Sequence, residues 1–312
     1  MDIRTTLKQG IAKLREAEVP SFTLTAELLL LHVLGRNRTW LYAHPEELVS
    51  DFNAQHFFDL IARRITGEPT QYLTGKQEFW GLEFEITPDV LIPRSETEHV
   101  IEVALDRLAL RELHAGRPQT TTGEGLQVAD IGTGSGCIAI ALAKELPAAN
   151  FVATDICATA LEVAKRNAQR HGVADRIRFI ECNLLDAFPV AAQHAAPVVH
   201  QSPITRHQSA QFDLIASNPP YIGRREAASL PREVRDHEPH SALFGGEEGY
   251  EFYAGLIAQA AQHLKPVGIL VIELGHNSLE AVQPLLDSSA WTNVGVTNDL
   301  AGIPRVLAGE RI

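Results

Sequence analysis

The chain has 312 residues, of which 45% are hydrophobic and 21% charged, and its formal net charge is −12. That length accommodates two domains and a sizeable core, and the ordinary composition excludes a disordered or fibrous protein. The longest apolar runs are too short to span a bilayer, and the stretch MDIRTTLKQG lacks an apolar signal-peptide core, so we expect a cytoplasmic protein that does not enter membranes.

The negative charge is unevenly distributed. Residues 1–75 carry eight Lys and Arg against nine Asp and Glu, whereas the remainder carries 19 against 30. An acidic body matches a phosphate backbone poorly, so we expect no direct nucleic-acid binding, although a local basic patch would still permit it. The cysteines Cys137, Cys157 and Cys182 lack metal-ligand spacing and are expected to be buried thiols.

Residues 1–75 are predicted to form an all-helical domain. Apolar residues recur at helical spacing in TLKQGIAKLREAEV and in TAELLLLHVLG, the second of which ends at Gly35. A third helix is expected over VSDFNAQHFFDLIARRITG, ending near Gly67.

Residues 76–95 are interpreted as a hairpin and linker. The alternation in QEFWGLEFEI, with Gly81 in the middle, predicts a short hairpin. Pro93 then precedes a helix expected from about Glu96 to Leu113, and Ser95 with Glu98 matches a capping box. Residues 114–125 are expected to be a loop.

Residues 96–312 are predicted to form an α/β domain. From residue 126 onward strand-like and helix-like segments alternate, which is typical of a parallel sheet with helices on both faces. The segment 190–211 has no period and is interpreted as a long surface loop or flexible insertion, and we assign no metal site to its three histidines.

A glycine-rich loop, DIGTGSG, follows the first of these strands. It comprises Asp130, Ile131 and the run Gly132, Thr133, Gly134, Ser135 and Gly136. The dinucleotide fingerprint is missed because Cys137 stands where the third glycine would be. The acid at 130 suits a cationic ligand, and S-adenosylmethionine carries an ammonium and a sulfonium.

Two further strand ends carry polar residues that suit a nucleoside. Asp155 ends the next strand, where a carboxylate can accept both ribose hydroxyls, although the same residue could serve as a helix N-cap. Asn183, before Leu184, follows the third strand; it either hydrogen-bonds the adenine amino group or forms an Asn-turn.

The stretch SNPPYI, residues 217–222, leaves the fourth strand at the same edge of the sheet. Asn218 and the carbonyl of Pro219 can accept hydrogen bonds from a planar NH2 group, and the ring of Tyr221 can lie against a flat substrate. The substrate is therefore expected to present either an exocyclic base nitrogen or a carboxamide. Orientation and electrostatics suffice for such chemistry, and no general base is required.

Together these segments resemble the HemK/PrmC family of protein-(glutamine) N5-methyltransferases, which act on class I peptide chain release factors. The resemblance covers nearly the whole chain and includes LIPRSETE, EPHSALFGGEEGYEFY, the strand ending IELG and the tail DLAGIPRVL. It implies a Rossmann-like class I S-adenosylmethionine-dependent methyltransferase domain with a seven-stranded, mostly parallel sheet, preceded by a small helical domain that docks the release factor.

The resemblance also implies residue roles. Residues 132–136 would line the S-adenosyl-L-methionine site, Asp155 would bind the ribose, and Asn183 with Leu184 would contact the adenine; S-adenosyl-L-homocysteine would be the product. Asn218, Pro219, Pro220 and Tyr221 would hold the glutamine of the Gly-Gly-Gln motif. Asn218, Pro219 and Tyr221 would be the catalytic residues, and Asn218 would also contact the cofactor. Arg94 would either guide the release-factor loop or pair with Glu96 or Glu98. Asp299 and Arg305 are expected to join the last strands.

Three positions depart from the family pattern. Ser95 stands where Pro is usual, Asn183 and Leu184 stand where some relatives carry Asp and an aromatic residue, and GHNS after the IELG strand lacks a frequent Gln. Two alternatives remain: a nucleic-acid amino methyltransferase using the same NPPY loop on a flipped base, and a non-catalytic binding module. The first predicts a basic groove, and the second predicts damage to the glycine loop or NPPY; neither feature is visible.

Overall fold

The computed structural model describes residues 1–114, 123–189, 211–286 and 289–312. The chain forms two compact units. The helical unit comprises Met1–Gln77, Ile86–Pro88 and Ser229–Glu238, and the sheet unit comprises Glu78–Glu85, Asp89–Ala228 and Pro239–Ile312. The segment 229–238 thus clusters with the N-terminal helices although in sequence it lies within the predicted methyltransferase domain. The predicted insertion 190–211, apart from Gln211, lies outside the described residues.

The helical unit is built on three long helices that correspond to the three predicted ones. Leu14, Leu29 and Phe57 are fully buried in its core, and a Cβ on Gly10 would lie 2.4 Å from Phe57 Cζ, so α1 and α4 approach closely. Two shorter helices, α3 and α5, were not predicted because they hold too few residues to show a period. The helices of this unit are α1 (Ile3–Glu16), α2 (Phe22–Leu34), α3 (Arg38–Ala43), α4 (Asp51–Ile65), α5 (Thr70–Thr74) and α9 (Arg232–His237).

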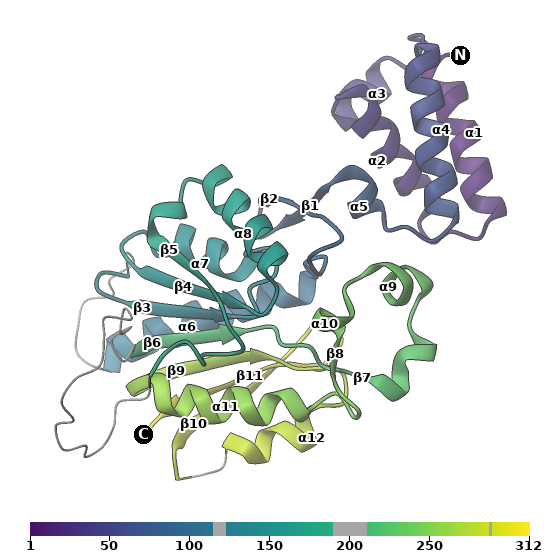
Figure 1. Ribbon diagram of the computed structural model, residues 1–312. Coiled ribbons are helices and arrows are strands. Elements are labelled where there is room, and N and C mark those ends of the chain that lie inside the picture. The colour runs from purple at the N-terminus through teal and green to yellow at the C-terminus, as the bar shows by residue number, and fades with distance from the viewer. Residues whose placement is uncertain (115–122, 190–210, 287–288) are drawn as a thin grey trace, which may run out of the picture. The chain divides into compact units, whose positions relative to one another are not determined.

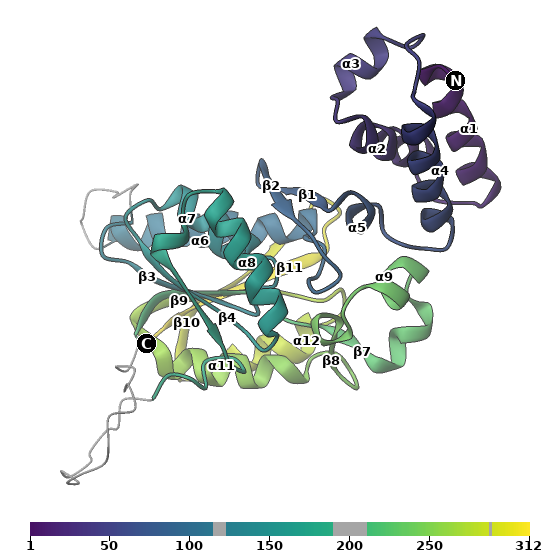
Figure 2. The same cartoon turned by 45° about the horizontal axis from the view of Figure 1, so that its top comes forward.

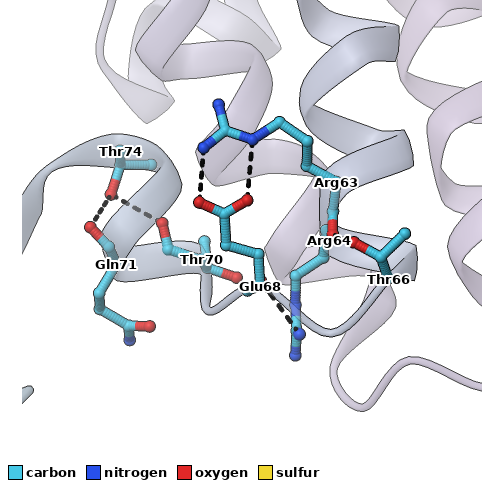
Figure 3. Close-up of polar contacts among 7 residues, drawn as sticks. All are labelled: Arg63, Arg64, Thr66, Glu68, Thr70, Gln71 and Thr74. Atoms are coloured by element: carbon cyan, nitrogen blue, oxygen red, sulfur yellow. Dashed lines mark hydrogen bonds and ion pairs between the residues drawn. The ribbon is translucent and has the colours of Figure 1, made fainter. Parts of the chain in front are cut away.

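Polar contacts stabilise the turn between α4 and α5. Arg63 Nε donates to Glu68 Oε2 at 2.8 Å, and Arg64 Nη1 donates to the Glu68 carbonyl at 3.3 Å (Figure 3). The Thr74 hydroxyl donates back to the Thr70 carbonyl at 3.0 Å. The Arg64 side chain is buried and forms an ion pair with Glu233 of α9. These contacts hold the end of α4, the turn and α9 together within the helical unit.

The predicted hairpin is confirmed. Strands β1 (Lys76–Phe79) and β2 (Leu82–Glu85) are joined by Trp80 and Gly81, both with positive φ, as a two-residue hairpin turn requires.

The predicted capping box is wrong. A 3₁₀ turn, η1 (Ser95–Thr97), precedes α6 (Glu98–His114), so Ser95 lies within the first turn and not at the N-cap. The Ser95 hydroxyl donates to Glu96, and the Glu98 carboxylate accepts the Trp80 backbone N–H at 2.7 Å. Glu98 therefore joins the hairpin to α6.

The sheet unit contains the predicted seven-stranded sheet. Its order is β10-β11-β9-β6-β3-β4-β5; β11 runs antiparallel to both neighbours and the other pairings are parallel. As predicted, Asp299 and Arg305 join the last two strands, through an Nε–Oδ2 contact of 2.8 Å. The strands are β3 (Gln127–Ile131), β4 (Asn150–Asp155), β5 (Ile177–Glu181), β6 (Phe212–Ser217), β9 (Leu264–Glu273), β10 (Trp291–Asn298) and β11 (Pro304–Arg311).

Helices cover both faces of this sheet. Helices α6, α7 (Cys137–Glu145) and α8 (Ala158–Arg170) lie on one face, and α11 (Glu251–His263) and α12 (Leu279–Val282) lie on the other (Figures 1 and 2). Strand β6 is buried along its whole length, as expected for a central strand of a covered parallel sheet. Remaining short elements are η2 (Ala174–Arg176), β7 (Ile222–Gly223), η3 (Arg224–Ser229), α10 (His240–Leu243), β8 (Phe244–Gly246) and η4 (Gln283–Leu286).

Among the described residues, every helix falls short of the length and hydrophobicity that crossing a bilayer would require.

Candidate functional site

A cavity of about 240 Å³ lies in the sheet unit at the carboxyl ends of β3, β4, β5 and β6. Each of these strand ends contributes to the lining: Gly132 after β3, Asp155 at the end of β4, Cys182 after β5 and Asn218 after β6. The sheet order changes direction at β3, and crevices at such switch points are the usual ligand sites of open α/β sheets.

The glycine loop forms one wall of the cavity. The N–H groups of Gly132 and Thr133 donate to the Thr154 carbonyl at 2.8 and 2.9 Å, and the Gly134 N–H donates to Asp155 Oδ2 at 2.9 Å. Gly132 and Gly134 have positive φ, and a Cβ at either position would meet open space. The backbone therefore leaves room for a ligand at the edge of the sheet.

The Asp130 carboxylate stabilises this loop through hydrogen bonds. Its side chain is fully buried and is not among the residues that line the cavity. Oδ2 accepts the Thr133 hydroxyl at 2.6 Å and the Ala139 N–H at 3.1 Å, and burial raises the pKa of the carboxyl to about 7. Thr133, Ser135 and Gly136 are likewise buried behind the wall. A direct contact between Asp130 and a ligand stays a prediction.

Asn167 on α8 is a structural residue that the sequence reasoning missed. It is fully buried, and its Nδ2 donates to the Ser135 carbonyl at 2.9 Å and to the Glu85 carbonyl at 3.0 Å. Its Oδ1 accepts the Glu85 N–H at 2.7 Å. The side chain thus connects the glycine loop to the hairpin. The sequence carried one signal for this role, because Asn167 is a polar residue on the face of a predicted helix that packs against the core.

Asp155 and Asn183 lie where the sequence placed them, on the cavity. Asp155 is partly buried, and this burial raises the pKa of its carboxyl; Oδ1 accepts the Cys157 N–H at 2.9 Å. Asn183 is exposed, and its Nδ2 donates to Asp186 at 3.2 Å. The residue therefore takes part in a local turn and also lines the cavity.

Apolar groups complete this half of the cavity. Leu184 is buried, has φ of +49° and lines the wall, as expected for that position. Ile156, which the sequence reasoning missed, also lines it although its side chain is 64% exposed. A large apolar side chain left open beside an acidic strand end suits a flat hydrophobic group.

Asn218, which follows β6, also lines the cavity. Its Nδ2 donates to the Thr97 hydroxyl at 3.0 Å, whereas its Oδ1 is buried and has no hydrogen-bond partner in the part of the chain that the structure describes. Pro220 also lines the cavity, and Pro219 is buried. A buried acceptor without a partner costs roughly 1–3 kcal/mol, which a donor from a ligand would recover.

The loop after Asn218 is supported by a second glycine segment. Strand β8 pairs with β7, and a Cβ on Gly245 would lie 2.2 Å from the Pro220 carbonyl oxygen. Only glycine therefore allows β8 to approach the NPPY loop this closely.

Tyr221 and Arg94 are not among the residues that line the cavity. The Tyr221 ring packs against the core cluster beneath α11, and a Cβ on Gly275 would lie 3.0 Å from its Cδ2. Burial raises the pKa of Tyr221, and the nearby Arg94 opposes this shift. Their contacts with a substrate stay predictions.

Comparison with known proteins agrees with this geometry. The family described as PrmC N-terminal domain matches residues 5–75, and the family described as methyltransferase domain matches residues 122–292. A release factor glutamine methyltransferase of Koribacter versatilis (strain Ellin345) is 41% identical over 312 residues, covering 100% of this chain and 99% of that protein. The chain belongs to the release factor glutamine methyltransferase family.

Other members of the family show the same extent of similarity. The release factor glutamine methyltransferase of Nitratidesulfovibrio vulgaris (strain Hildenborough) is 38% identical over 307 residues, covering 98% of this chain and 94% of that protein. The predicted family assignment is therefore confirmed, and both the helical N-terminal region and the methyltransferase domain are family features.

The fold is shared more widely than the family. The catalytic domain of hMettl16, solved in complex with MAT2A 3'UTR hairpin 6, aligns with a TM-score of 0.52 at 20% identity, covering 80% of this chain and 81% of that chain. This similarity confirms the class I methyltransferase fold of the sheet unit.

Proposed function

We propose that this protein transfers a methyl group from S-adenosyl-L-methionine to the side-chain amide nitrogen (N5) of the glutamine in the Gly-Gly-Gln motif of class I peptide chain release factors, in the bacterial cytoplasm. The observation that carries the proposal is that Asn218, whose Oδ1 is buried without a hydrogen-bond partner among the described residues, lines the same cavity as the glycine loop. The names of the relatives support the release factor as substrate.

The cavity fits S-adenosyl-L-methionine. Gly132 and Gly134 leave open space for the amino-acid part, and the Asp155 carboxylate retains lone pairs for the ribose hydroxyls. Ile156 and Leu184 offer apolar surfaces for the adenine. When bound, this donor supplies a methyl group on a positively charged sulfonium, and S-adenosyl-L-homocysteine is the product.

Asn218 supplies the orientation that the chemistry needs. An amide nitrogen is a poor nucleophile because its lone pair is conjugated with the carbonyl. Asn218 Oδ1 and the Pro219 carbonyl accept the two N–H bonds of the glutamine and hold the nitrogen lone pair toward the cavity. The same acceptors stabilise positive charge that develops on the nitrogen, and the proton is lost once the nitrogen has become acidic.

Methylation of an intact release factor tests this function. The purified protein is incubated with methyl-labelled S-adenosyl-L-methionine and either a release factor or its variant with Glu in place of the Gly-Gly-Gln glutamine. We expect label on the wild-type factor, located on that glutamine by peptide mass spectrometry, and none on the variant. Label on RNA with an unmodified glutamine peptide would instead support an amino methyltransferase acting on nucleic acid.

A further inference from the structure

We infer that Thr97 and Glu273 are positioning residues that turn the Asn218 carbonyl oxygen toward the substrate, through a chain from carboxylate to hydroxyl to amide. This inference rests on the proposed function. Thr97 and Glu273 come from the segments LIPRSETE and IELG, to which the mechanism so far gives no task.

The topology of the sheet brings the three residues together. Ser217 on β6 pairs with Ile272 on β9 in parallel register, so the next residues, Asn218 and Glu273, emerge side by side at the carboxyl edge. Thr97 closes η1, 121 residues before Asn218, and only its position in the fold places it beside the amide. Thr97 and Glu273 are each 1% exposed.

The Glu273 carboxylate determines the direction of the hydrogen bonds that link Glu273, Thr97 and Asn218. A carboxylate can only accept, so the Thr97 hydroxyl uses its single proton toward Glu273, and its oxygen is left to accept from Asn218. Burial raises the pKa of Glu273, and hydrogen bonds from the Thr97 and Tyr221 hydroxyls to its carboxylate oppose that rise. The amide then directs Nδ2 toward Thr97, at 3.0 Å, and Oδ1 away from it.

The alternative orientation of the amide would prevent catalysis. If Asn218 were flipped, its NH2 group would face the glutamine NH2 group, and two donors would meet. Thr97 would then donate to Asn218 and leave Glu273 without that hydrogen bond inside the protein. Since Oδ1 has no partner among the described residues, nothing else in their contacts determines which way the amide faces.

Substitutions at Thr97 separate this role from a merely structural one. In Thr97→Val the hydroxyl is lost at nearly constant shape, and we expect kcat to fall on the order of tenfold to a hundredfold with the affinity for S-adenosyl-L-homocysteine unchanged. Thr97→Ser restores the hydroxyl and is expected to recover most of kcat. Thr6→Val removes the hydroxyl of another buried threonine, which lies in the helical unit and donates to the Asp2 carbonyl at 2.8 Å; it is the matched control and is expected to retain the wild-type kcat.

The pH profile supplies a second readout. Burial raises the pKa of Glu273 to about 7, so its carboxylate form, and with it the required orientation of Asn218, is populated only as pH rises through that value. Wild-type kcat is expected to rise across pH 7, and Glu273→Gln is expected to remove that rise and lower kcat. The groups that act on this carboxyl are Glu96 and Thr97 on η1, Tyr221, Cys137 on α7, Tyr253 on α11 and Arg305 on β11.

Failure of the inference is distinguishable from failure of the proposed function. If the wild-type protein leaves the release-factor glutamine unmethylated, the function itself is contradicted. If the wild type is active, three results each overturn the inference: unchanged kcat in Thr97→Val, an equal loss in Thr97→Ser, or a loss of cofactor affinity in Thr97→Val that matches its loss of turnover.

Discussion

Asn218 is the residue on which the proposed chemistry depends most. Asn218→Ala removes the buried acceptor but leaves the other residues that line the cavity, including Gly134 and Asp155, in place. We expect kcat to fall by about 10²–10³, as when one preorganised transition-state contact is removed. Isothermal titration with S-adenosyl-L-homocysteine should show unchanged affinity. Equal turnover by the variant would remove Asn218 from the mechanism.

Glu273 should also appear in the pH dependence of stability. Its folded-state pKa, about 7, lies above its ordinary value of 4.5, so wild-type stability falls as pH rises from about 4.5 to about 7 and is then level. Glu273→Gln lacks this penalty. We expect the variant to gain stability relative to the wild type across that window, by up to about 3 kcal/mol.

Urea unfolding of both proteins at pH 5 and pH 8 measures this gain. Asp130 titrates in the same range, but it is present in both proteins and cancels in the difference. A stability difference that is the same at both pH values would contradict the assigned ionisation of Glu273.

Sequence reasoning at the residue scale succeeded where a motif is contiguous. The glycine loop, Asp155 and Asn218 each follow a recognisable strand, so their place at the sheet edge followed from the alternation of strands and helices. The contacts of Asn167, and separately those of Thr97 and Glu273, were not predicted, because the partners are distant in sequence and only the folded sheet brings them together.

At the scale of elements, the β7–β8 pair holds the NPPY loop in position. The Glu251 carboxylate, at the start of α11, accepts the backbone N–H groups of Glu247, Glu248 and Gly249, each at 2.9 Å, and so fixes the turn that follows β8. This turn and the close approach of Gly245 make β8 a rigid support for the site.

Gly245→Ala tests this support. The added methyl would overlap the Pro220 carbonyl, so we expect a loss of about 1–3 kcal/mol in stability together with reduced kcat. Gly295→Ala is the control, because the atoms near its Cβ belong to the flexible end of Arg107. Thermal unfolding and turnover measured on both variants decide the question; equal behaviour of the two would show that the loop does not depend on β8.

Long helices were easier to predict from the sequence than short ones. The long helices α1, α2 and α4 show clear periods and were anticipated within a few residues, whereas α3, α5 and η1 are too short to show one. The existence of seven strands was anticipated from the family resemblance. The insertion of β11 between β9 and β10 depends on long-range pairing that local patterns do not encode.

At the scale of the whole molecule, the helical unit is proposed to dock the release factor. It has its own core, and its most exposed large apolar side chains are Leu48 at 79% and Phe52 at 78%. Exposed aromatic and aliphatic groups on a nearly neutral surface are suited to protein binding.

Phe52→Ser therefore separates docking from chemistry. We expect its KM for an intact release factor to rise on the order of tenfold, while kcat/KM for a short Gly-Gly-Gln peptide stays at the wild-type value. Leu300→Ser, which removes a fully exposed side chain of the sheet unit, is the control and should change neither. A parallel loss on both substrates in Phe52→Ser would contradict a docking role.

The most direct test of the account is a crystal structure of the protein with S-adenosyl-L-homocysteine and a release factor. We expect the glutamine amide nitrogen about 3 Å from both Asn218 Oδ1 and the Pro219 carbonyl oxygen, and facing the sulfur of the cofactor. A glutamine bound elsewhere, or an Asn218 Oδ1 occupied by a group of the protein itself, would contradict it.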